Sequence, residues 1–115
     1  MPTDRLLCSE LVSIIPGGSR GPLRAVPGNL EEIGEWSALV LTEAFLGPGM
    51  RLSIACEWHE IKGVVESCTF EPSLGYYVEV KLDPESRWSQ QWFTPQHLVA
   101  LWDNLGPKVL HLKTA

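Results

Sequence analysis

Apolar and polar residues alternate over much of the chain, and this alternation is the main structural signal in the sequence. Every second residue of the segment 50–56 is apolar, and the segment 76–82 repeats the pattern with Glu79 and Lys81 on the opposite face. A period of two with one polar face is typical of half-buried antiparallel strands. By this pattern, or by apolar and β-branched content, five strands are predicted, over residues 6–15, 37–42, 50–56, 60–70 and 76–82.

Turn residues separate these segments at regular intervals. Gly47-Pro48-Gly49 precedes the segment 50–56, and Pro72-Ser73-Leu74-Gly75 connects the last two strands. Several short strands with this spacing predict a barrel or a sandwich, and a barrel also removes exposed sheet edges. The near-continuous apolar run 37–42 predicts a strand that is buried on both faces. The segment 16–28 is rich in glycine and proline, so we expect an exposed loop there.

The C-terminal part of the chain predicts one helix. Thr94 suits the N-cap, Pro95 suits the first helical position, and Gly106-Pro107 would end the helix. Its apolar stripe would consist of Leu98, Val99, Leu101 and Trp102. Residues 108–115 would form either a last strand or a loose tail. We therefore expect a single domain over residues 1–115, with a core at about 6–102. Its fold would be mainly β, a six- or seven-stranded antiparallel barrel with one C-terminal helix.

Composition narrows the classes of function. The chain has 115 residues and a formal net charge of -5. Nine Lys and Arg residues, spread along the sequence, give no basic face for nucleic acid, so neither DNA nor RNA is an expected partner. No apolar stretch approaches the length of a membrane span, and the three cysteines form no C-x-x-C pair. We expect a cytoplasmic protein with reduced thiols and no membrane contact.

Two arginines in the predicted loop are the first candidate binding residues. Arg20 and Arg24 are separated by three residues and flanked by glycines. Guanidinium is planar and permanently charged, so it suits the phosphates of a nucleotide and stacks on its bases. On spacing alone, two solvated arginines in a flexible loop are the simpler explanation of the pattern.

A second candidate segment follows at 29–41. A carboxylate such as Glu32 would accept the paired N–H donors of a guanine edge, and Gly34 would expose its backbone to a ligand. The alternative is a turn that leads into a strand, with Glu31, Glu32 and Glu35 solvated.

Taken together, these motifs resemble a PilZ domain. The family pattern is R-x-x-x-R followed by [D/N]-x-S-x-x-G, and its members bind the bacterial second messenger cyclic di-GMP on the outside of a small β-barrel. Arg20 and Arg24 match the first element. Glu32, Gly34 and Ser37 stand at the acid, serine and glycine positions of the second element, and none of the three is the residue of the family pattern. The resemblance covers roughly residues 6–102. Its framework comprises Leu46–Leu52, Gly63–Cys68, Gly75–Val80 and the segment from Ser86 to Leu98.

The three departures from the family motif weaken the expected ligand site. Glu32 moves the carboxylate outward by one methylene, Gly34 removes a hydroxyl, and Ser37 adds a Cβ. Each lost hydrogen bond to a charged group is worth about 1.5–3 kcal/mol, so two or three losses take micromolar binding to a negligible level. The resemblance therefore implies a PilZ-like regulatory module, a degenerate cyclic di-GMP receptor that acts mainly through a protein partner and has no cofactor.

Exposed aromatic residues provide the alternative function. Trp36 and Trp58 lie at predicted turns, which makes them candidate anchors for a protein partner, while core packing is the ordinary role for the other tryptophans. A rival interpretation is an SH3- or Tudor-like barrel that binds a peptide or a methylated cation. It would require two or three exposed aromatic side chains that converge beside a carboxylate.

The sequence predicts no enzyme and no metal site. The run Gly17-Gly18-Ser19-Arg20-Gly21 fits the G-x-S-x-G nucleophile motif, but Pro22 and a short chain exclude the strand-turn-helix of a hydrolase. Cys56, His59 and Cys68 lack the paired spacing of a zinc site.

Overall fold

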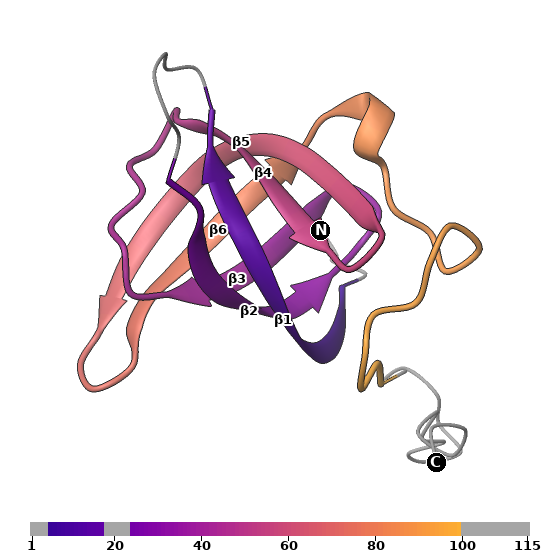
Figure 1. Cartoon of the computed structure of the whole chain (residues 1–115), viewed down its shortest axis with the longest axis horizontal. Coiled ribbons are helices and arrows are strands. Elements are labelled where there is room, and N and C mark those ends of the chain that lie inside the picture. Colours follow the sequence, from indigo (N-terminus) through magenta and orange to yellow (C-terminus); the bar gives the residue numbers. More distant parts are fainter. Residues whose placement is uncertain (1–4, 18–23, 100–115) are drawn as a thin grey trace.

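The protein forms a closed antiparallel β-barrel. The computed structural model describes residues 5–17 and 24–99. Its strands are β1 (Leu6–Pro16), β2 (Val26–Ile33), β3 (Ser37–Thr42), β4 (Arg51–Cys56), β5 (His59–Glu71) and β6 (Gly75–Leu82). They close in the order β1-β2-β3-β6-β5-β4 (Figure 1). The prediction of a mainly β, six-stranded barrel is thus confirmed. Within the described residues, no helix is long and apolar enough to cross a membrane.

Alternation places the apolar side chains of each strand inside the barrel. In β1, Leu6, Cys8, Val12 and Ile14 are buried while the residues between them, except the buried Glu10, face outward. The expectation that β3 is buried on both faces is correct only for its inner face, because the outward Leu39 and Leu41 are half-buried. The hydrophobic effect of the inward residues, which pack into one core cluster, stabilises the barrel.

Strand β2 corrects the last part of the loop predicted over 16–28, and the turn predicted after it; residues 18–23 of that loop lie outside the described residues. Val26–Ile33 pairs with both β1 and β3 although it contains Pro27 and Gly28. A Cβ at Gly28 would lie 2.7 Å from Ile14 Cδ1 and 3.0 Å from the Leu41 carbonyl oxygen. Glycine is therefore required here by the close approach of neighbouring strands and not by a turn.

Strand β5 is shared between two neighbours. Its first half pairs with β4, from Cys56↔His59 to Arg51↔Val64. Its second half pairs with β6 as far as Glu71↔Gly75, with a bulge between Val65 and Ser67. The β5–β6 hairpin consequently extends beyond the barrel, at the lower left of Figure 1. We call residues 66–77 the projecting hairpin.

The segment 83–99, which we call the lid, covers the opposite end of the barrel (Figure 1). It starts with a single 3-10 turn, Pro84–Ser86. Trp88 is buried, its backbone N–H donates to the Glu35 carbonyl oxygen, and its indole N–H donates to the Phe93 carbonyl oxygen. Phe93 in turn stacks on His59 at a ring-centroid distance of 4.5 Å. The lid thus closes this end with aromatic side chains.

The predicted helix does not begin at Thr94. Residues 94–99 form a turn and a single antiparallel bridge between Val99 and Leu7. The Ser9 N–H donates to the Gln96 carbonyl oxygen, and the Val99 N–H donates to the Leu7 carbonyl oxygen. These bonds to β1 replace helical ones, and the positive φ of His97 (58°) also interrupts a helix. The rest of the predicted helix and the tail at 108–115 lie outside the described residues.

Candidate functional site

Arg24 and Glu32, one residue from each half of the predicted nucleotide motif, lie at opposite ends of β2. Arg20 falls outside the described residues. Arg24 is exposed two residues before β2 begins, whereas Glu32 is the penultimate residue of that strand. Eight residues of extended chain span about 25 Å. The structure therefore does not bring Arg24 and Glu32 together, and a shared site with Arg20 stays a prediction.

Glu32 is bound by a residue of its own chain. Arg5 Nε lies 3.1 Å from Glu32 Oε1, and the two terminal nitrogens of Arg5 donate to both carboxylate oxygens of Glu79, at 2.7 and 3.1 Å. The hydrogen bonds to Glu79, with a weaker contribution from the charge of Glu32, raise the pKa of Arg5 above its ordinary value. This ion triad joins the outer faces of β2 and β6, and it occupies one oxygen of the Glu32 carboxylate that was expected to contact guanine.

Gly34 and Ser37 form the turn between β2 and β3. The Gly34 N–H donates to the Ser37 carbonyl oxygen at 2.8 Å. Gly34 is buried, so the expectation that it exposes its backbone to a ligand is wrong. Ser37 is half-buried as the first residue of β3. Both residues therefore have a role in the turn itself.

Trp36 lies in the same turn and is 48% exposed. The Arg87 guanidinium carbon lies 5.2 Å from the centroid of its ring, and Arg87 also pairs with Glu35 at 3.2 Å. The Trp36 carbonyl oxygen accepts a hydrogen bond from the Leu82 N–H. These contacts connect the turn to the lid and leave about half of the Trp36 side chain to solvent.

Trp58 is far more open. It lies in the β4–β5 turn, next to Glu57 with its positive φ of 51°, and is 89% exposed. Like Trp36, it is an exposed turn tryptophan, as the sequence predicts. The surroundings of Trp58 offer a better candidate site than those of Trp36, because its neighbour Glu57 lines a hollow in the barrel wall.

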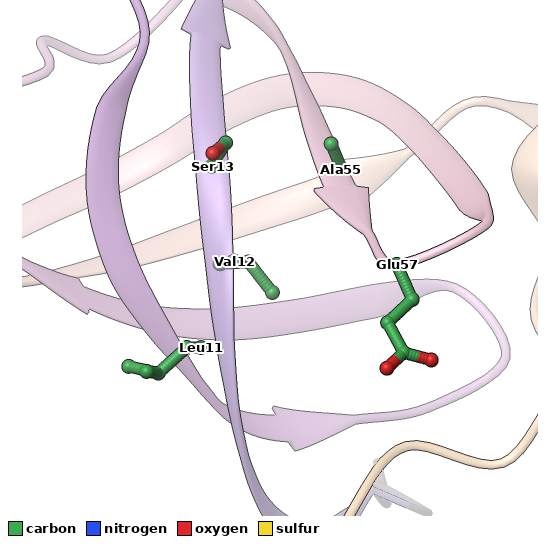
Figure 2. A pocket seen from close by; sticks show the side chains of 5 residues that line it. All are labelled: Leu11, Val12, Ser13, Ala55 and Glu57. Carbon is green, nitrogen blue, oxygen red and sulfur yellow. The ribbon is translucent and has the colours of Figure 1, made fainter.

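This hollow opens where β1 and β4 separate. The two strands pair only from Ser13↔Ala55 to Pro16↔Leu52, although β1 begins at Leu6. The hollow has a volume of about 310 Å³. It is lined by Leu11, Val12, Ser13, Ala55 and Glu57 (Figure 2). Leu11 projects from the β1 side and Glu57 from the end of β4.

The backbone of Leu11 faces this hollow. The Leu7 carbonyl and the Ser9 N–H both point toward the lid, where they bond to Val99 and Gln96. Alternate residues of a strand direct their polar groups to the same side, so Leu11 directs its N–H and C=O into the gap between the lid and β4. Its side chain is 81% exposed. The sequence does not indicate this site, because nothing in the local pattern distinguishes Leu11 from the other apolar residues of β1.

A second apolar group lies on and beside the projecting hairpin. The Phe45 and Phe70 rings lie 5.6 and 5.3 Å from the Tyr76 ring and are 60% and 58% exposed. Rings at these distances are in contact, so Tyr76 joins the two phenylalanines into one exposed aromatic cluster. The aromatic cage of the SH3- or Tudor-like alternative stays a prediction.

Comparison with known proteins identifies no relative. No family model matches the chain, and neither the curated proteins nor the solved structures contain a significant match. The resemblance to PilZ domains rests on the sequence motifs, and what is established for this chain is a closed, six-stranded antiparallel barrel.

Proposed function

We propose that the chain is a non-catalytic binding module that acts through protein–protein contacts at the surface formed by Leu11, Glu57 and Trp58, which we call the seam surface. The single observation that carries the proposal is that Trp58 and Leu11, at 89% and 81%, are the most exposed large apolar side chains among the described residues. Leu11 lines the hollow together with Glu57, the chain neighbour of Trp58. Tryptophan is a favoured anchor of interfaces, and burial of exposed apolar area drives association.

The chemistry of the hollow favours a basic side chain of the partner. The Glu57 carboxylate at its wall is an acceptor. The Leu11 carbonyl, which strand alternation directs toward the hollow, is a second acceptor, and a lysine or arginine supplies the matching donors. Apolar residues beside that cation would pack on Leu11 and Trp58. The net charge of -5 attracts a basic partner over a longer range. The proposed ligand is thus a protein segment with a cation next to an apolar anchor.

Cyclic di-GMP is the weaker candidate ligand. Arg24 would be available for a phosphate, but Glu32 is bound to Arg5 and Gly34 is buried. Isothermal titration with cyclic di-GMP beside an Arg24→Ala control tests this. We expect no heat at high ligand concentration. Micromolar binding that the control abolishes would instead establish a messenger receptor.

The protein-binding proposal is tested with a displayed library of random twelve-residue peptides. Selection is carried out on the wild-type protein alone, and the selected peptides are then tested on the variants. We expect most of them to combine a lysine or arginine with an aromatic or aliphatic residue. Their affinity should fall about tenfold or more on Trp58→Ser and on Glu57→Gln.

Trp36→Ser is the matched control, because it removes an exposed turn tryptophan away from the hollow. It should bind the selected peptides like the wild type. Urea unfolding of each variant verifies that the barrel is intact. If the selection yields no peptide, or peptides that bind Trp58→Ser equally well, the seam surface is not the binding site.

A further inference from the structure

The outer edge of β5 is unpaired over its last residues. β4 covers β5 as far as Val64, and Val65 is bonded to Met50 and Gly49 through its N–H and C=O. Beyond the bulge, β5 pairs only with β6 on its other side, and no described strand covers the opposite edge. We call residues 66–71 the free β5 edge. All of them are exposed except Cys68, which is half-buried.

The two faces of this edge differ in polarity. Cys68 pairs with the buried Val78 and Phe70 pairs with Tyr76, so both belong to the inner, apolar face. Ser67, Thr69 and Glu71 alternate with them on the outer, polar face. Phe70 contacts the Tyr76 ring but keeps 58% of its surface exposed. A strand added here would therefore find an apolar contact on one face and polar partners on the other.

The charges at the two ends of the free β5 edge determine which strand can pair with it. Glu66 and Glu71 are exposed at the two ends of the free β5 edge. A second copy of the chain, paired antiparallel, would bring the Glu71 of each copy to the Glu66 end of the other. Like charges across strands are destabilising, and charged residues are a common protection of edges against self-pairing. The same two carboxylates attract a strand with a lysine or arginine at each end.

We infer that the free β5 edge binds an extended segment of a partner protein by β-strand addition. The segment has five alternating residues, with apolar side chains opposite Cys68 and Phe70 and basic side chains opposite Ser67 and Glu71. Backbone hydrogen bonds hold it to β5, while the alternation and the two cations give it specificity. None of these residues belongs to the seam surface, so this inference does not depend on the proposed function.

A synthetic peptide tests the inference on the full chain. The probe is Lys-Ile-Thr-Ile-Lys between Gly-Ser flanks, and its control is Glu-Ile-Thr-Ile-Glu in the same flanks. Amide chemical shifts and hydrogen exchange should change at residues 67–71 with the first peptide. The control should bind about tenfold more weakly or not at all. Shifts confined to Leu11, Glu57 and Trp58, or equal binding of both peptides, would overturn the inference.

The double variant Glu66→Lys/Glu71→Lys should reverse the preference for the two peptides. Both side chains are exposed, so its urea unfolding should match that of the wild type. Trp58→Ser should leave peptide binding at the free β5 edge unchanged, which separates this site from the seam surface. A double variant that keeps the wild-type preference would show that the carboxylates do not select the strand.

Self-association provides a test that needs no ligand. The single variant Glu71→Lys would place a lysine next to the Glu66 of an antiparallel copy, so it should dimerise in sedimentation experiments. The wild type and the double variant should stay monomeric, because each has like charges at both ends. A wild-type dimer through β5 would make a second copy the occupant. A Glu71→Lys variant that stays monomeric would mean that the edge is not available.

Discussion

The two ends of the barrel carry similar aromatic residues, but these residues are buried at one end and exposed at the other. At the lid end, Trp88 is only 5% exposed, its indole N–H is hydrogen bonded, and Phe93 stacks on His59. At the other end, Phe45 and Phe70 contact Tyr76 yet remain largely in solvent. The chain therefore covers one end with its own lid and leaves the aromatic residues of the other exposed.

The cysteines follow the same division. Cys8 and Cys56 are buried in the core, whereas Cys68 is half-buried on the projecting hairpin. Burial raises the pKa of both Cys8 and Cys56 to about 12, with a smaller contribution from the carboxylate of Glu10. Burial in the core thus strongly disfavours the thiolate form of these two cysteines.

The sharpest way to test the contrast between the ends is to truncate one aromatic residue at each. Trp88→Ala removes a buried ring and its hydrogen bond, so we expect a loss of about 3–5 kcal/mol in the free energy of unfolding. Phe70→Ala should cost about 1 kcal/mol or less, because most of its side chain is already exposed. Urea unfolding measures both. Equal losses would mean that the two ends are equally important for stability.

Alkaline pH should weaken the core through its thiols. In the folded protein Cys8 and Cys56 keep their protons up to a pKa of about 12, whereas the unfolded chain releases them near a pKa of 9.0. The stabilisation is complete below pH 9, and it is lost as the pH rises from there toward 12. Urea unfolding at several pH values measures this slope. Cys8→Val should reduce it, and an unchanged slope would assign it to other groups.

The ion triad at Arg5 should contribute a smaller amount. Arg5→Ala leaves Glu32 and Glu79 without their cation, and we expect a loss of about 1 kcal/mol because the group is only partly buried. Arg5→Lys should restore part of it. Because salt screens such pairs, the loss should shrink at high ionic strength. A loss independent of salt would point to packing of the arginine stem instead.

The smallest effect is expected at the tip of the projecting hairpin. Leu74 is half exposed in the β5–β6 turn, and Leu74→Ser should change the free energy of unfolding by about 0.5 kcal/mol or less. Thermal unfolding beside Trp88→Ala measures the difference. A loss comparable to that of Trp88→Ala would show that the tip is packed and would contradict the contrast between the ends.

The parts of the fold that the sequence predicts well are those set by local pattern. The alternation around Val78 and Val80 places β6 within one residue of its observed bounds. Trp58 is exposed as expected because the turn residues around it are local too. Strand β2 was missed because Gly28 is explained only by Ile14 and Leu41 on neighbouring strands, which no local pattern contains.

The lid, and the part of the seam surface formed by Leu11 and Glu57, escaped prediction for the same reason. Thr94 and Pro95 are good local signals for a helix, but the backbone groups of Gln96 and Val99 form hydrogen bonds to β1 instead of helical ones. Likewise, Leu11 becomes a candidate contact residue only because β4 ends before it reaches that part of β1. Which strands pair, and for how long, depends on residues far apart in the sequence.

The bridge between Leu7 and Val99 has a consequence for how the protein is made. Strand β1 is completed by residues that are synthesised more than eighty positions later, as the Gln96–Glu10 hydrogen bond also requires. Until then, the N-terminal half of β1 presents an unpaired edge, in addition to the free β5 edge at the other end of the barrel. Unpaired edges of nascent chains associate readily with other strands. The growing chain is therefore most exposed to aggregation just before the lid emerges.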